Sequence, residues 1–119
     1  MTARELFLEE LARALDYWIN EATNVLTSTD ASLTWTDEPG SFRTLQQVVV
    51  SQRVPQNTVR SVAAELFRGF AVSCLTIIDG GTELAENVSV RIVDEAGRTL
   101  SDSLHDDFVT HLISSGRMQ

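Results

Sequence analysis

The segment FAVSCLTIIDGG, residues 70–81, constrains the fold of this chain more than any other part of the sequence. It is mainly apolar up to Asp79, and two glycines follow that acid. A helix that is apolar around its whole circumference is normally enclosed by protein, so we predict a buried central helix over about 57–79. Glycine tolerates positive φ, and Gly80 and Gly81 are therefore predicted to end this helix.

Three further segments have helical signals. Residues 3–26 carry apolar side chains at helical spacing, so Trp18 is predicted to be a core side chain, and Thr2 with Glu5 fits a capping box at the start. A last helix is predicted over about 104–115, with Ser103 as its N-cap and Gly116 as its stop. The stretch 42–52 is ambiguous, because its apolar spacing is helical while its run of three valines favours a strand. We favour a helix there.

The run VSVRIVDEAGRTLS, residues 88–101, predicts a β-hairpin. Val90 and Ile92 alternate with polar residues, and Gly97 can take the left-handed position of the turn. A lone hairpin is marginal in water, so this one must lie on the helices, gain a third strand or pair with another chain. The predicted fold class is α+β and mostly helical. Three to four helices surround the buried central helix, and a small β-hairpin precedes the last helix, in a single compact domain over 1–119.

Charge and composition narrow the classes of partner. The chain has 17 acidic and 9 basic residues, a net charge of −8, and every base is arginine. Such a chain repels phosphate backbones and anionic lipid, so we predict no nucleic-acid partner and no membrane partner. A basic protein partner is compatible with the charge. The start MTARELFLEE lacks the cations of a signal peptide, and no apolar run approaches about 18 residues, so we expect a cytoplasmic protein.

The segment LHDDFVTHL, residues 104–112, holds the most suggestive cluster of ionisable residues. Asp107 and His111 have the i,i+4 spacing that metal ligands use on a helix, whereas His105 is predicted to point toward the core, on the side of Phe108, Val109 and Leu112. We favour a hydrogen-bonded histidine and an acid pair near a helix N-terminus, with a metal or acid–base site as the alternative. Two ligands do not define a catalytic metal site, and we predict no metal and no cofactor.

Asp79 and Cys74 are the other candidates for chemistry. A carboxylate at a helix C-terminus meets the negative end of the helix dipole, so a local contact must offset the conflict. We favour a turn residue for Asp79 and keep a functional carboxylate as the alternative. Cys74 is predicted to be a small core residue, because an apolar environment disfavours the reactive thiolate.

Three residues are candidates for an interface. Trp35 lies in a polar loop, where it either packs onto the core, which we favour, or anchors a partner. Val90 and Ile92 belong to the hairpin that needs a companion.

The C-terminal half, from Ala63 to Arg117, contains the segments LFRGFAVSCLTIIDGG, VRIVDEAGRTLSDSLHDDF and HLISSGR. Through these segments it resembles an uncharacterised family of small acidic bacterial proteins with no assigned function. The resemblance implies a compact intracellular bacterial domain, and it implies no catalytic residues.

The sequence therefore predicts a non-catalytic protein-interaction module. Its function would be self-association as a homodimer, or immunity- or antitoxin-like binding of a basic partner. The alternative is a small metal-assisted hydrolase that uses Asp79, His105, Asp107 and His111, and a third reading is a bundle that binds an apolar ligand. For the alternative to hold, these side chains must converge, and we expect that Asp79 and His105 do not share an open cleft.

Overall fold

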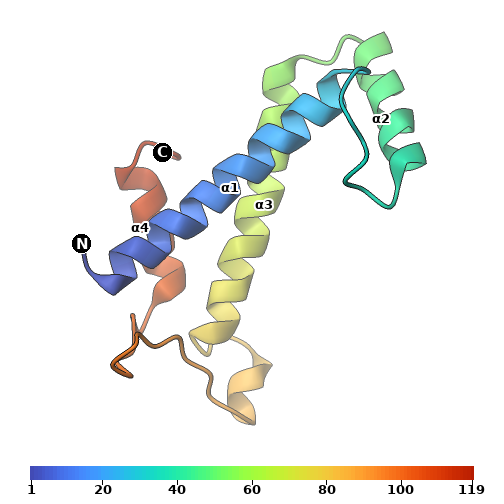
Figure 1. Ribbon diagram of the computed structural model, residues 1–119. Coiled ribbons are helices and arrows are strands. Elements are labelled where there is room, and N and C mark those ends of the chain that lie inside the picture. The colour runs from blue at the N-terminus through green and yellow to red at the C-terminus, as the bar shows by residue number, and fades with distance from the viewer. The chain divides into compact units, whose positions relative to one another are not determined.

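A computed structural model describes residues 1–119 of the protein. Four α-helices and one short 3₁₀ helix account for its regular structure (Figure 1). In chain order they are α1 (Ala3–Thr27), α2 (Pro39–Ser51), α3 (Gln56–Ile78), η1 (Glu83–Glu86) and α4 (Leu104–Ser114). The ambiguous stretch 42–52 is therefore helical, as we favoured.

The chain divides into two compact units. Unit 1 comprises Met1–Ala14 and Arg68–Gln119, and unit 2 comprises Leu15–Phe67. The first half of α1 belongs to unit 1 and its second half to unit 2. The first half of α3 belongs to unit 2 and its second half to unit 1. The two units are described separately below.

Local sequence signals account for the helix ends. The predicted capping box is confirmed, because Thr2 and Glu5 exchange hydrogen bonds between side chain and backbone, both at 3.1 Å. The predicted stop after α3 is also confirmed: Gly80 has φ +82°, and the N–H of Gly81 donates to the carbonyl of Thr76 at 2.9 Å. These are the features of a Schellman motif, in which a left-handed residue lets the chain cap its own last turn.

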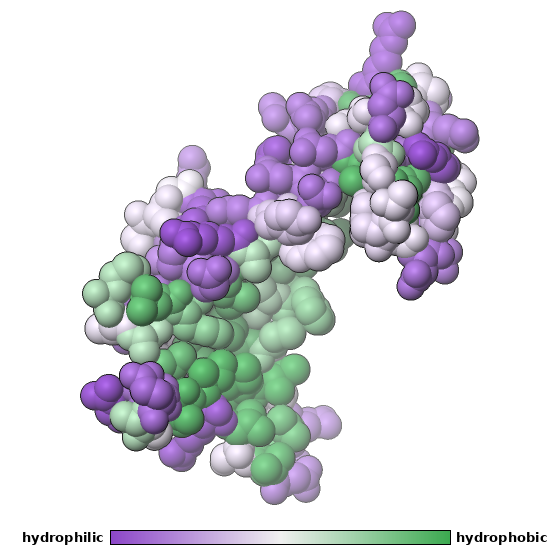
Figure 2. Space-filling model, in the orientation of Figure 1, coloured by the Kyte–Doolittle hydropathy of each residue, from purple (hydrophilic) through white to green (hydrophobic).

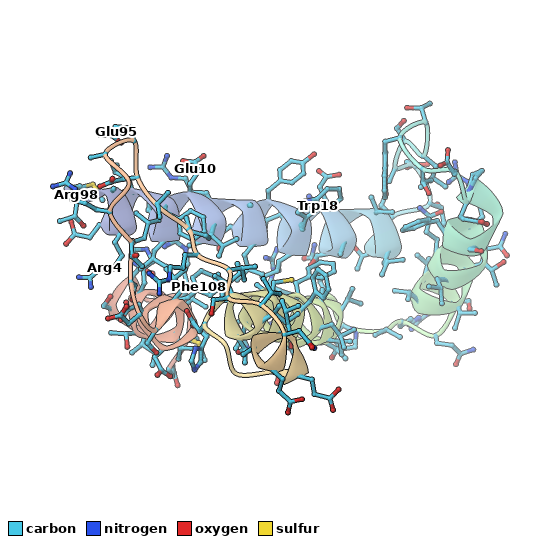
Figure 3. The ribbon with its side chains drawn as sticks, turned by 90° about the horizontal axis from the view of Figure 1, so that it is seen from below. Arg4, Glu10, Trp18, Glu95, Arg98 and Phe108 are labelled. Carbon is cyan, nitrogen blue, oxygen red and sulfur yellow. The ribbon has the colours of Figure 1, made fainter.

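Unit 1 has its core where α4 meets the first half of α1 and the second half of α3. Phe108 is completely buried, and Figure 3 labels it among the side chains between α4 and α1. The prediction that Phe108 and Leu112 lie on the inner side of the last helix is confirmed. The buried apolar residues of this unit are Leu8, Ala12, Leu75, Leu104, Phe108 and Leu112.

Unit 2 is held together by a buried amide as well as by apolar packing. Gln46 on α2 is fully buried, and its Nε2 donates to the carbonyl of Val25 at 2.8 Å. That carbonyl belongs to the last turn of α1, where carbonyls have no partner within the helix. Arg43 donates in turn to Oε1 of Gln46 at 3.0 Å and to the carbonyl of Thr29 at 2.8 Å. Gln46 therefore fixes α2 against the end of α1.

We predict that Gln46→Leu lowers the free energy of unfolding by about 1–2 kcal/mol, because a buried carbonyl would lose its donor. Urea unfolding followed by circular dichroism measures the change. The matched control is Gln47→Leu at the exposed neighbouring position, which should differ from the parent by less than about 0.5 kcal/mol. Equal stability of the two variants would contradict the structural role of Gln46.

The predicted α+β class is wrong, because the chain forms no sheet. Between residues 88 and 101 there is one isolated antiparallel bridge, between Val93 and Thr99. The turn itself forms as predicted: Gly97 has φ +80°, and Asp94 accepts hydrogen bonds from two following backbone N–H groups. The N–H of Leu100 still donates to the carbonyl of Ile92 at 3.0 Å, and beyond Leu100 the second arm leaves its partner, because the Ser101 hydroxyl contacts the start of α4. Figure 3 shows Glu95 and Arg98 at the tip of the turn.

The prediction of a buried central helix is also wrong. In unit 1 the side chain of Phe70 is 74% exposed and that of Ile77 is 41% exposed, while Leu75 is buried. An apolar circumference predicts a buried helix only where the chain supplies enough protein to surround it, and the chain covers only part of the circumference of α3. Figure 2 shows apolar side chains across much of the visible face of unit 1.

Candidate functional site

Asp79 joins the end of α3 to the beginning of α4. Its Oδ1 accepts a hydrogen bond from the N–H of Leu104 at 2.9 Å, and its Oδ2 accepts one from the N–H of His105 at 2.8 Å. Oδ2 also lies 2.5 Å from Nδ1 of the His105 ring. The side chain of Asp79 is only 5% exposed. This carboxylate therefore caps a helix that begins 25 residues later in the chain.

The contact with α4 offsets the unfavourable position of the Asp79 carboxylate at the negative end of the α3 dipole. Asp79 follows the negative end of α3, but its carboxylate lies at the positive end of α4 and accepts from that helix's first N–H groups. The predicted cap of α4, Ser103, makes no capping bond with its side chain, and its hydroxyl donates to Asp106 instead. Asp79, for which we favour the role of a turn residue, thus also joins the end of α3 to the start of α4.

The contact between Asp79 and His105 shifts both pKa values toward the charged forms. Burial acts to raise the pKa of Asp79, but the hydrogen bonds from His105 and Leu104 outweigh it and hold the value below 3.8. The hydrogen bond to Asp79 raises the pKa of His105 above 6.5, and burial only partly opposes it. The negative charges of Asp106 and Asp107 act in the same direction as Asp79.

Asp107 and His111 take part in different contacts. Asp107 accepts a short hydrogen bond from the hydroxyl of Ser101, and Arg4 lies 3.7 Å from its carboxylate. The Nε2 of His111 lies 3.2 Å from Oε1 of Glu9. The four residues of the hydrolase alternative are therefore divided among separate contacts. No group of three or more His, Cys, Asp or Glu side chains is placed to hold a metal ion.

The contact between Glu9 and Arg117 was missed by sequence reasoning. Nη1 of Arg117 donates to Oε1 of Glu9 at 2.8 Å, and hydrogen bonds from Arg117 and then His111 lower the pKa of Glu9. The sequence signal that did exist was the i,i+4 pair with Arg13, which is longer, at 3.8 Å. Glu9 and Arg117 are 108 residues apart, so no local pattern could have joined them.

An acid–base role would need a nucleophile or substrate at the free nitrogen of His105. Its Nε2 lies 3.5 Å from the carboxylate of Asp106, and no hydrogen bond joins Cys74 to either histidine. Cys74 itself is half-buried on α3. The geometry of this region therefore orients an imidazole without presenting a reacting group to it.

An open cavity of about 270 Å³ lies beside Asp79. Val90 and Ile92, two of the predicted interface residues, line it together with Ile77, while His105 does not. Asp79 and His105 are thus in direct contact without both facing this cavity.

Trp35, the third predicted interface residue, belongs to a cluster of four aromatic side chains in unit 2, which we call the aromatic patch. Its ring centroid lies 6.4 Å from that of Trp18 and 5.2 Å from that of Phe42, both edge to face. Tyr17 extends the cluster, 5.3 Å from Trp18. Trp35 also donates its indole N–H to the carbonyl of Ser32 at 3.0 Å. Trp35 is 48% exposed, so it packs on other rings without being buried.

Trp18 differs from its prediction. Its helical position predicted a core side chain, but it is 49% exposed on α1, where Figure 3 labels it. Tyr17 beside it is 56% exposed.

The segment Gln56–Glu86 is long and apolar enough, by length and composition, to cross a membrane. The expectation that no such segment exists is therefore wrong. Only 11% of the most apolar 18-residue stretch of this segment is buried, whereas the core helix of a soluble protein is mostly buried. Length and composition do not by themselves show insertion, since signal sequences and core helices meet the same criterion.

No protein-family model, no curated protein and no solved structure matches this chain. The resemblance of its C-terminal half to small acidic bacterial proteins stays a prediction.

Proposed function

We propose that this chain is a non-catalytic protein-interaction module that binds a basic protein partner through the aromatic patch. The observation that carries the proposal is the exposure of rings that are already fixed in place. Tyr17, Trp18 and Trp35 are each about half exposed, although each packs edge to face on a neighbouring ring.

Fixed aromatic side chains suit a binding surface. Tryptophan and tyrosine contribute a large contact area and dominate the energetics of many protein interfaces. A ring that is held before binding loses little conformational freedom when a partner covers it. The indole N–H of Trp35 is already bonded to Ser32, so its orientation does not depend on the partner.

Charges next to the patch favour a basic partner. Asp37 and Glu38 follow Trp35 closely in the chain, both are exposed, and neither carboxylate forms an ion pair within the chain. Glu21, one turn after Trp18 on α1, has no ion pair either. Arginine side chains of a partner could stack on the exposed rings and meet these carboxylates. Immunity- and antitoxin-like inhibitors are one class of acidic protein that acts by such binding.

Tryptophan fluorescence can report binding at the aromatic patch. Trp18 and Trp35 are its only tryptophans, and both belong to the patch. We predict that nona-arginine, used as a probe of a basic surface, changes the tryptophan fluorescence in a saturable and salt-sensitive way. Nona-glutamate should cause no change.

Two variants distinguish binding at the aromatic patch from nonspecific attraction to the net negative charge of the chain. Trp35→Ala should weaken nona-arginine binding at least about tenfold in calorimetry, as expected for an interface anchor. Leu45→Ala removes a side chain that is 52% exposed on α2 of the same unit and should bind like the parent. Equal affinity of both variants would mean that the peptide senses only net charge, and the proposed function would fail.

A further inference from the structure

The segment 88–92 has the sequence of a β-strand, but its strand-like pairing within its own chain is limited to one hydrogen bond at its end, from the N–H of Leu100 to the carbonyl of Ile92 at 3.0 Å. Val88, Val90 and Ile92 alternate with Ser89 and Arg91, and β-branched residues favour strands. However, the N–H groups of Ser89, Val90 and Arg91 donate to no acceptor in the chain. The one bridge nearby begins after the segment, at Val93. The sequence thus specifies a pairing that the single chain makes only at the end of the segment.

The apolar side of this segment is only partly covered. Val88, Val90 and Ile92 line the open cavity of about 270 Å³ beside the end of α3, together with Ile77. Val88 remains 48% exposed and Val90 40% exposed. An added strand would place alternate side chains on the same side as these residues, next to the cavity.

We propose that residues 88–92 pair antiparallel with the same residues of a second copy of the chain, which forms a two-stranded sheet across a homodimer. A two-fold axis at Val90 sets the register. It places Val90 opposite Val90 of the second copy and Val88 opposite Ile92, so the apolar residues share one face. Ser89 then lies opposite Arg91. A register centred on Arg91 would bring two guanidinium groups together, which disfavours it.

Charge complementarity supports a second copy as the occupant. Arg91 is the only charged residue in the segment, and it has no ion pair within the chain. Glu86, at the end of η1, has none either. Antiparallel pairing about Val90 places Arg91 of one copy opposite Ser89 of the other, three residues from Glu86, and we expect an ion pair between Arg91 and Glu86 there. The symmetry supplies this contact twice.

Cysteine crosslinking tests the register directly. In the proposed dimer the two copies of residue 90 lie directly opposite each other, with Cα atoms about 4.5–5.5 Å apart, within the range that a disulfide spans. In a Cys74→Ser background, Val90→Cys should therefore give a covalent dimer on mild oxidation. The matched control is Val93→Cys, at a site that is 50% exposed against 40% for Val90 and lies three residues away, so that its two copies would be about 20 Å apart. We expect at least tenfold more crosslinked product from Val90→Cys.

Sedimentation equilibrium supplies the second readout on the full chain. The parent should show twice the monomer mass at micromolar concentrations, and Val90→Glu should show the monomer mass, because it places two carboxylates opposite each other. Val90 is exposed in the single chain, so this substitution should leave its circular dichroism unchanged. A monomeric parent, a dimer that persists in Val90→Glu, or equal crosslinking at both positions would overturn the proposal. None of these outcomes depends on the nona-arginine assay, so this inference and the proposed function fail separately.

Discussion

Replacing Phe108 with alanine is expected to lower the free energy of unfolding by about 3–5 kcal/mol. Phe108 is completely buried in unit 1, and Leu104 and Leu112, one turn before and after it on α4, are each 1% exposed. Truncation would leave a cavity among side chains that have little freedom to close it. Domains of this size are stable by about 5–15 kcal/mol, so the loss is a large fraction of the total.

Urea unfolding measured by circular dichroism tests this prediction. Phe108→Leu keeps most of the buried volume and should cost clearly less than the alanine variant. Ile113→Ala, at a position on the same helix that is 48% exposed, should change the free energy by less than about 1 kcal/mol. A loss below about 1 kcal/mol for Phe108→Ala would show that α4 does not pack as described.

The sequence predicts the helices of this fold well. Their ends depend on local chemistry: the reciprocal bonds of Thr2 and Glu5, and the left-handed glycines Gly80 and Gly116. Each of these signals acts within a few residues, so periodicity and capping rules can detect it. The buried face of α4 follows from the same periodicity.

What surrounds a helix could not be predicted in the same way. An apolar circumference indicates that α3 needs partners, but it does not indicate whether the chain supplies them. Phe70 is largely exposed because the chain covers only the side of α3 that carries Leu75. The prediction of a hairpin is wrong for a related reason. The alternation at Val90 and Ile92 predicts a strand, but a strand pairs only where a second strand lies within reach. Both errors concern regions where the chain leaves apolar groups uncovered.

Long-range polar contacts could not be predicted from the sequence either. Gln46 occupies a position that its polarity marks as exposed, yet it is fully buried because a carbonyl of α1 lies beside it. The partner of Asp79 lies 25 residues away, and only the unfavourable position of that carboxylate indicated that a contact was missing. The sequence therefore identified Asp79 as unusual but could not identify α4 as the reason.

Replacing Asp79 with alanine is expected to lower the free energy of unfolding by about 2 kcal/mol, at the upper end of the range for helix caps. The substitution removes the acceptor of two N–H groups at the start of α4 and the partner of His105. Asp79→Asn retains an acceptor oxygen without the charge and should cost less. Asp102→Asn is the matched control, because Asp102 is an exposed acid near the same cavity. It should behave like the parent.

The pH dependence of this difference distinguishes the ion pair from a simple cap. The pKa of Asp79 is lowered in the folded chain, so its contribution is present above about 3.8 and is lost as pH falls through the folded value. The pKa of His105 is raised, so its contribution is complete below 6.5 and is lost as pH rises through the folded value. The stability difference between the parent and Asp79→Asn should therefore be largest between pH 3.8 and 6.5 and should shrink on both sides. Asp106, which lies 3.5 Å from the other nitrogen of His105, is unchanged in both proteins, so its charge does not create the difference. A difference that stays constant from pH 5 to pH 9 would show that Asp79 acts on the backbone of α4 alone.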